Sequence, residues 1–431
     1  MRSFIVILML FFELLQVAIG NRKELTHTPT TEEWDELYTL AQRQTMVGIA
    51  FRGVEQLPGE QRPPKPLLMQ WYMATERIKA LNADLDRKAL AVANRFLEEG
   101  FPGMVLKGQG VAKLYRETHP NPPCKGGDAG IADGHPDGKF SILNSQFSIK
   151  EYRTPGDIDI WLQGSREEVL DYVRRHVPDC KPVYHHVDFP VVDGLDIEVH
   201  FTPSWMNSPV TNHRLQRFFR GERNSNFEVR SSAYSELPIF KSQTVPLFIE
   251  GRAEQSEAEG VTSVARRQSY SEIPSPILAF NRIYILVHIY RHLFHEGIGL
   301  RQLLDYYFVL HQGFTEEERA ETMRTLRSLK MERFTAAVMW VLQEVYGMDG
   351  RYLLTTPDER EGRFLLGEIM LAGNFGHYDE RIKRVANESA LHTFVRRVTR
   401  NFRFVRSYPS EVLWTPIFKL WHWVWRRRQS N

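Results

Sequence analysis

Two short stretches near the middle of the chain alternate acidic with apolar residues, and this alternation constrains the fold more than any other feature. The first, "DIDIWL", begins at Asp157, and the second, "LDIEVHF", begins at Leu195. Residues i and i+2 of a β-strand point to the same face of a sheet. Asp157 and Asp159 are therefore expected to project together, while the isoleucines between them enter the core. Both stretches predict β-strands with an acid-bearing face.

Two carboxylates this close repel each other unless one takes a proton or a cation lies between them. Mg²⁺ suits this role because it prefers oxygen ligands and is commonly held by one or two carboxylates together with substrate phosphates. If the two strands are neighbours, Glu198 supplies a third carboxylate, with Asp196 as the rival third acid. Three such acids can hold two metal ions about 3.5–4 Å apart. The other interpretation is the polar face of an antiparallel sheet.

A segment upstream of these acids, "MVLKGQGVAKLY" (104–115), predicts a short strand, a glycine-containing turn and a helix. Gly108 and Gly110 allow the main chain to approach a ligand closely. The start of the following helix favours a phosphate, and Lys107 adds a positive charge. The segment is therefore a candidate phosphate-binding turn, and a tight turn without a ligand is the alternative.

The periodicity of apolar residues divides the chain into three regions. Residues 1–100 are expected to be helical, 101–205 to form a mixed α/β core, and 206–431 to be helical again. Capping boxes are expected where Thr30 precedes Glu33 and where Ser165 precedes Glu168.

Two polar segments are predicted to be long loops. Residues 119–148, inserted in the α/β core, are rich in Gly, Pro, Asp and Asn, and residues 250–269 are polar with little periodicity.

Composition excludes some classes of function and leaves others open. The formal charge of +2 provides no overall argument for binding nucleic acid or an anionic membrane. Only two cysteines occur, so a disulfide framework is excluded and a reducing, cytoplasmic compartment is expected. The apolar N-terminal segment is interpreted as a packed helix, because Glu13 interrupts it and its uninterrupted run is too short to span a bilayer. A signal peptide or anchor is the alternative.

Histidines and arginines in the C-terminal half have two interpretations each. His288, His292 and His295 share one helix face, which indicates either a metal or acid–base site or a polar packing seam. Basic residues interleaved with aromatic ones from Arg396 to the end indicate either a packed final helix or a surface for nucleic acid or membrane. His185 and His186 are expected on a strand surface, and Asp305 is expected to pair with Arg301.

Together these segments resemble the nucleotidyltransferases of the DNA polymerase β superfamily, and more closely the bacterial family known as uncharacterised nucleotidyltransferase. The resemblance covers most of the chain. It rests on three motifs. The first is "LKG" followed by a tyrosine, here Leu106-Lys107-Gly108 with Tyr115. The second is an arginine before "DIDI", here Arg153 with Asp157 to Ile160, and the third is an acid-x-His strand, here Glu198-Val199-His200.

This resemblance implies a fold, a site and cofactors. The fold would be α+β, with a polymerase β-like mixed sheet between helical N- and C-terminal regions. Mg²⁺ or Mn²⁺ would be the metal, and a nucleoside triphosphate (NTP) the substrate. The implied metal-binding and catalytic residues are Asp157, Asp159 and Glu198, and the implied triphosphate-binding residues are Lys107, Gly108, Gln109 and Arg153. The turn departs from the superfamily, which usually has Gly-Ser or Gly-Gly at this point.

The implied activity is metal-dependent transfer of a nucleoside monophosphate from an NTP to the hydroxyl of an acceptor whose identity the sequence leaves open. One alternative is a binding protein that keeps the fold without its chemistry, which the altered turn favours. Another is a transferase that acts on RNA or belongs to a toxin–antitoxin pair, with the basic C-terminal region as its nucleic-acid contact.

Overall fold

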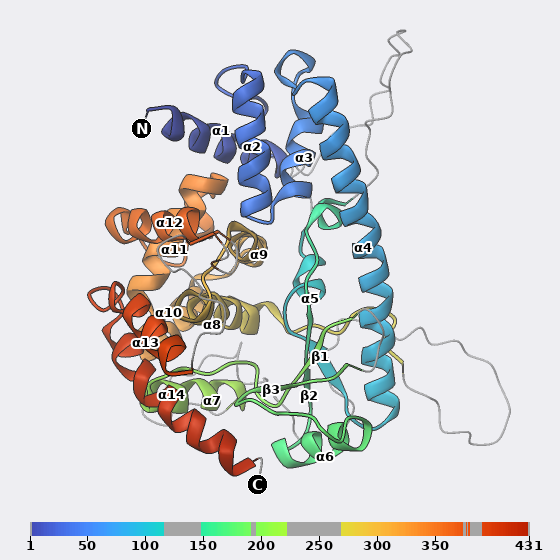
Figure 1. Cartoon of the computed structure of the whole chain (residues 1–431), viewed down its shortest axis with the longest axis vertical. Helices are drawn as coiled ribbons and strands as arrows, with labels where there is room; N and C mark the ends of the chain where they lie inside the picture. The colour runs from blue at the N-terminus through green and yellow to red at the C-terminus, as the bar shows by residue number, and fades with distance from the viewer. Residues whose placement is uncertain are drawn as a thin grey trace, which may run out of the picture.

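The computed structural model describes residues 2–115, 148–190, 195–221, 269–373, 376, 378–379 and 390–429. The two predicted loops, 119–148 and 250–269, lie outside the described residues except for the last residue of each. Helices dominate, and a small mixed sheet lies among them (Figure 1). The predicted α+β class, with helical regions before and after the sheet, is confirmed.

Four helices precede the sheet, and α4 runs along one side of the molecule (Figure 1). Thr30 and Glu33 form the predicted capping box at the start of α2. The apolar N-terminal segment is a helix, α1, that packs against α3 and, from the far end of the sequence, α11. The bounds of the four are α1 Arg2–Ala18, α2 Thr31–Arg43, α3 Val47–Gln56 and α4 Lys65–Glu98.

The sheet has four strands in the order β1-β2-β4-β3. Strands β2 and β4 pair in parallel, and the outer pairs are antiparallel. The capping box of Ser165 and Glu168 starts helix α6 directly after β2, as predicted. The bounds are β1 Gly103–Val105, α5 Gln109–Ala112, β2 Ile158–Leu162, α6 Arg166–His176, β3 His186–Asp188 and β4 Ile197–His200.

The two faces of the sheet pack against different parts of the molecule. Ile158 and Ile160 enter a core formed with α4 and α6. On the opposite face, Trp161 joins the large helical core and stacks on Phe280 of α8. All five residues of β2 are buried. Asp159 is therefore buried, unlike the residues on the polar surface of a one-sided antiparallel sheet.

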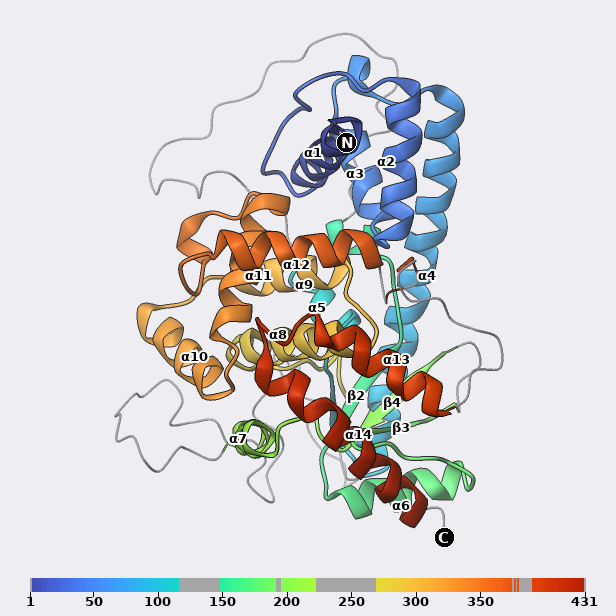
Figure 2. The same ribbon diagram turned by 60° about the vertical axis from the view of Figure 1, so that its left-hand side comes forward.

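The C-terminal half contributes eight helices to the described residues. Helices α8 and α9 are almost wholly buried, whereas α13 and α14 lie across the front of the molecule in Figure 2. Within the described ranges, no helix has the length and apolar character needed to cross a membrane. The bounds are α7 Pro209–Phe219, α8 Leu278–His295, α9 Leu300–His311, α10 Glu316–Ser328, α11 Glu332–Tyr346, α12 Glu359–Ala372, α13 Ala390–Phe402 and α14 Pro409–Gln429.

Candidate active site

Three carboxylates meet where the parallel strands β2 and β4 lie side by side. Asp159 is the register partner of Glu198, and Asp157 comes immediately before β2. All three line a cavity of about 710 Å³ between the sheet and the C-terminal helices. Asp196, the rival third acid, is exposed and does not line this cavity. The parallel register thus brings Glu198, and not Asp196, to the paired aspartates.

The ammonium group of Lys107 lies between the two aspartates. Its Nζ is 3.1 Å from Asp157 Oδ2 and 2.9 Å from Asp159 Oδ2. Burial alone would raise the pKa of Asp157, but the charge of Lys107, together with hydrogen bonds from Lys107 and the backbone, lowers that pKa overall. The main chain fixes this arrangement, because the amide of Leu106 donates to the carbonyl of Asp159. The repulsion between the paired acids is therefore relieved by a cation of the chain itself.

Two histidines reach the carboxylates from the neighbouring strands. His200 Nε2 is 2.9 Å from Asp159 Oδ1 and 3.4 Å from Glu198 Oε2. His186 Nδ1 is 3.1 Å from the same Glu198 oxygen. Burial would raise the pKa of Glu198, but its hydrogen bond with His200 and the charges around it lower that pKa to about 2. Glu198 is therefore ionised at neutral pH.

The prediction that His185 and His186 lie on a strand surface is wrong. Both line the cavity, and the His185 ring packs against Trp205 at 3.8 Å between ring centroids. Burial lowers the pKa of His185 well below its ordinary value and that of His186 to about 4. Both imidazoles are therefore neutral at physiological pH, and their ring nitrogens can accept hydrogen bonds or bind a metal.

The donor atoms at this site fit a divalent cation. One donor atom each from Asp159, Glu198 and His200 lies within 4.8 Å of the others. Asp159 Oδ2 is buried and pairs with the Lys107 ammonium at 2.9 Å, which shows that the position attracts positive charge. Carboxylate oxygens suit Mg²⁺ and Mn²⁺, and the imidazole nitrogen adds affinity for transition metals.

Arg153 lies away from the large cavity, although it was predicted to hold triphosphate. Its Nε and Nη2 donate to the two carboxylate oxygens of Asp305 at 2.7 and 2.8 Å, and both residues are buried. The predicted pair of Asp305 with Arg301 is wrong: Arg301 Nη1 instead donates to the carbonyls of Thr154 and Pro155. These contacts hold the main chain just before Asp157, so Arg153 and Arg301 position the acids.

The glycine-containing turn is compact, and the side chain of Gln109 points away from the large cavity. Gly108 has φ of +57°, a conformation that favours glycine. A Cβ on Gly110 would lie 2.1 Å from the Val105 carbonyl oxygen, so close packing requires this glycine too. Gln109 is buried and donates to Asp86 of α4. The expected helix is only four residues long. Of the predicted triphosphate-binding side chains, only Lys107 faces the large cavity.

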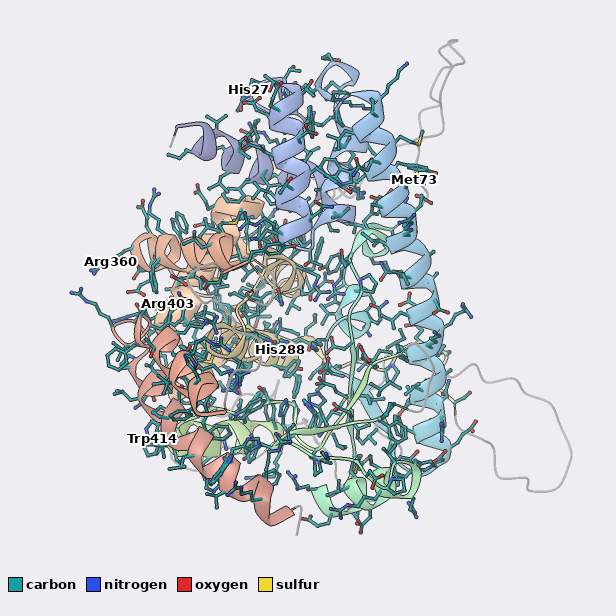
Figure 3. The ribbon with its side chains drawn as sticks, in the orientation of Figure 1. His27, Met73, His288, Arg360, Arg403 and Trp414 are labelled. Carbon is teal, nitrogen blue, oxygen red and sulfur yellow. The ribbon has the colours of Figure 1, made fainter. Side chains whose placement is uncertain are left out.

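The predicted histidine face of α8 forms the wall opposite the sheet. His288, His292 and His295 all line the cavity, and Figure 3 labels His288 near the centre of the molecule. Burial lowers the pKa of His288 and of His295 well below the ordinary value. These histidines form no metal-ligand cluster among the described residues. His288 and His295 are therefore neutral at physiological pH, and the three histidines contribute a polar lining to the cavity.

Arginines of α13 complete the cavity, and sequence reasoning did not assign them to the site. Arg396, Arg397 and Arg400 line the same cavity as the three carboxylates, more than 190 residues away along the chain. The available signal was their spacing, which places Arg396 and Arg400 one helical turn apart on one face. Nothing local indicated that this face meets the acidic strands.

Comparison with known families finds that parts of the chain are similar to a nucleotidyltransferase family. Residues 30–120 and 251–347 match the model of a family described as uncharacterised nucleotidyltransferase. The matched stretches include the Lys107 turn and α8 to α11, whereas the acidic strands lie between them. The resemblance to this family is confirmed. Neither the curated proteins nor the solved structures contain a significant match.

Proposed function

We propose that the protein is a metal-dependent nucleotidyltransferase that moves a nucleoside monophosphate from an NTP to an acceptor hydroxyl and releases pyrophosphate. The observation that carries the proposal is the meeting of Asp157, Asp159 and Glu198 on one cavity. The match to a nucleotidyltransferase family supports it at the level of reaction class.

In this reaction the acceptor oxygen bonds to the α-phosphorus, and the bond from that phosphorus to the pyrophosphate oxygen breaks. The acceptor hydroxyl releases its proton to a carboxylate of the site or to water, and pyrophosphate leaves with the electron pair of the broken bond. Divalent ions held by the three carboxylates would neutralise the charge that develops on the phosphoryl oxygens. The rest of the work is positioning of the two substrates, which a preformed cavity favours. Asp157 and Asp159 would be the main ligands, with Glu198 as the third carboxylate.

Lys107 has two successive partners in this proposal. Without substrate its ammonium group bridges Asp157 and Asp159. A metal ion entering between the carboxylates would compete with that ammonium, because both cations use the same oxygens. The triphosphate that arrives with the metal offers Lys107 a new anionic partner. The lysine therefore stabilises the empty site and then contributes to holding the nucleotide.

The position of Lys107 also favours a second candidate function. If its ammonium group permanently replaces the metal, the protein binds a nucleotide or another ligand without transferring it. The two candidates differ in metal dependence: the transferase binds NTP much more tightly with Mg²⁺ or Mn²⁺, whereas the binding protein does not.

The test compares wild type with Asp157→Asn, which keeps the size of the side chain and removes its charge. Incubation with each of four α-³²P-labelled NTPs, Mg²⁺ and cell extract should give a labelled product, and the variant should lose roughly 10²–10³-fold in rate. Asp171→Asn is the matched control, because Asp171 is an exposed acid on α6 outside the cavity. A folded Asp157→Asn protein with full transferase activity would refute the proposal.

A further inference from the structure

The large cavity has two walls of opposite charge. The carboxylates come from β4, from β2 and from Asp157 just before β2, while α8 and α13 contribute four arginines to the lining of the same cavity. Among the described residues, two acids, Glu296 and Asp379, also line the basic wall beside its four arginines. Glu296 contacts His292 at 3.4 Å, and Asp379 contacts Arg403 at 3.5 Å. Arginines are therefore the most numerous charged groups in the described lining of this wall.

Helix α14 adds a buried lysine near these arginines. The Nζ of Lys419 is buried and has no hydrogen-bond partner among the described residues. Burial, together with Arg397, Arg291 and the other α13 arginines, lowers the pKa of Lys419 to about 7. An amine buried beside several guanidinium groups is costly to charge. Such an arrangement is expected where an anion completes the site.

The arginines of this wall differ in their present roles. Arg291 is buried, lies over the Trp205 ring at 3.6 Å and donates to Asn207, so it belongs to the framework. Arg400 Nη2 donates to the Leu293 carbonyl and thereby ties α13 to α8. Arg397 is exposed and still lines the cavity, so its guanidinium can turn toward a ligand. Arg397 is therefore the residue to test.

We propose that Arg396, Arg397 and Arg400 of α13, with Lys419 of α14 behind them, form a phosphate-binding wall for a substrate held between it and the carboxylates. Planar guanidinium groups bind phosphate oxygens in pairs, which makes phosphate a better match for several clustered arginines than a singly charged carboxylate. The inference rests on the proposed transferase function and deepens it. The phosphate group belongs either to the NTP or to a phosphorylated acceptor.

The wall is tested without nucleotide or metal. Calorimetric titration of the full-length protein with inorganic tripolyphosphate in EDTA should show binding that weakens as salt increases. Arg397→Gln should weaken it roughly tenfold, because the variant loses a charge-assisted hydrogen bond. Arg406→Gln is the matched control: Arg406 is an exposed arginine outside the cavity, and its removal should leave the affinity unchanged.

A second titration identifies the source of the phosphate. Tripolyphosphate is added to protein already saturated with Mg²⁺ and a non-hydrolysable ATP analogue. Loss of tripolyphosphate binding assigns the wall to the triphosphate of the NTP, and retained binding assigns it to the acceptor. Either result supports a phosphate-binding wall.

Two results would overturn the inference: no salt-dependent tripolyphosphate binding by wild type, or equal affinities for wild type, Arg397→Gln and Arg406→Gln. Asp157→Asn separates this inference from the proposed function. That variant should lose metal-dependent nucleotide binding but keep tripolyphosphate binding in EDTA, since Asp157 lies on the opposite wall.

Discussion

The carboxylate wall and the basic wall of the cavity are built in different ways. The carboxylates sit on two strands in direct register and carry their own counter-charge in Lys107. The arginines sit on a helix near the end of the chain, beside a buried lysine whose charged form is disfavoured. Lys107 neutralises part of the charge of the first wall, whereas the described lining of the second wall has more arginines than acids. This difference indicates that the basic wall has more to gain from binding an anion.

The largest effect is expected from removing the buried support of the carboxylate wall. Asp305→Ala leaves the Arg153 guanidinium buried without its partner, because both residues are about 5% exposed or less. Loss of one member of a buried ion pair costs about 3–5 kcal/mol. Urea denaturation should show a fall of this size in the free energy of unfolding.

The double variant Arg153→Leu/Asp305→Leu is the control for that measurement. It removes both charges together and should be less destabilising than Asp305→Ala alone. If the single variant were as stable as wild type, the pair would not hold the segment before Asp157.

A moderate effect is expected from Lys107→Met, which removes the internal cation of the carboxylate wall and keeps a side chain of similar length. With the competing ammonium gone, Mn²⁺ should bind the carboxylates severalfold more tightly in the absence of NTP. Electron paramagnetic resonance of Mn²⁺ measures that affinity directly.

The same variant should bind the metal–nucleotide complex less tightly than wild type, since the triphosphate loses a cationic contact. Opposite changes in the two affinities are the signature of a lysine that moves between partners. Weaker Mn²⁺ binding in Lys107→Met would contradict a competition between lysine and metal.

The smallest effect is expected from Lys419→Met, which tests whether burial and the neighbouring arginines disfavour the charged form of this lysine. The pKa of Lys419 is lowered from 10.5 to about 7, so folding disfavours its charged form. Above pH 10.5 Lys419 is neutral in both the folded and the unfolded chain. As the pH falls from 10.5 toward 7, the unfolded chain takes up this proton and the folded chain does not, so the free energy of unfolding decreases. At pH 7 the variant should therefore melt about 1–3 °C higher than wild type.

The pH dependence of anion binding gives a second measurement on Lys419. The groups that face it are Arg291 and His295 of α8 and the three arginines of α13. Lys419 carries its charge only below about pH 7, and a bound anion favours the charged form. Tripolyphosphate should therefore bind wild type more tightly at pH 6.5 than at pH 8.5 and cause proton uptake at the higher pH. Lys419→Met should reduce both effects relative to wild type.

Local sequence patterns determined the elements that carry the site. Alternation of Asp157 and Asp159 with isoleucines predicted β2, and the capping boxes at Thr30 and Ser165 predicted the starts of α2 and α6. These features depend on residues within a few positions of each other, so the chain encodes them before it folds. A position of Glu198 beside Asp159 required the two strands to be neighbours. The parallel register of β2 and β4 places these two residues side by side.

Only the tertiary structure decided which charged groups became partners. Asp305 had an arginine four residues away, yet burial brought Arg153 to it from 152 residues away. Gln109 turned to α4, and the arginines of α13 reached a cavity whose acids lie on the sheet. A long charged side chain can meet any of several partners, and the packing of the helices selects one of them because an unpaired buried charge is costly. The sequence by itself therefore determined the strands and their acids, whereas packing determined the cation between them and the basic wall opposite.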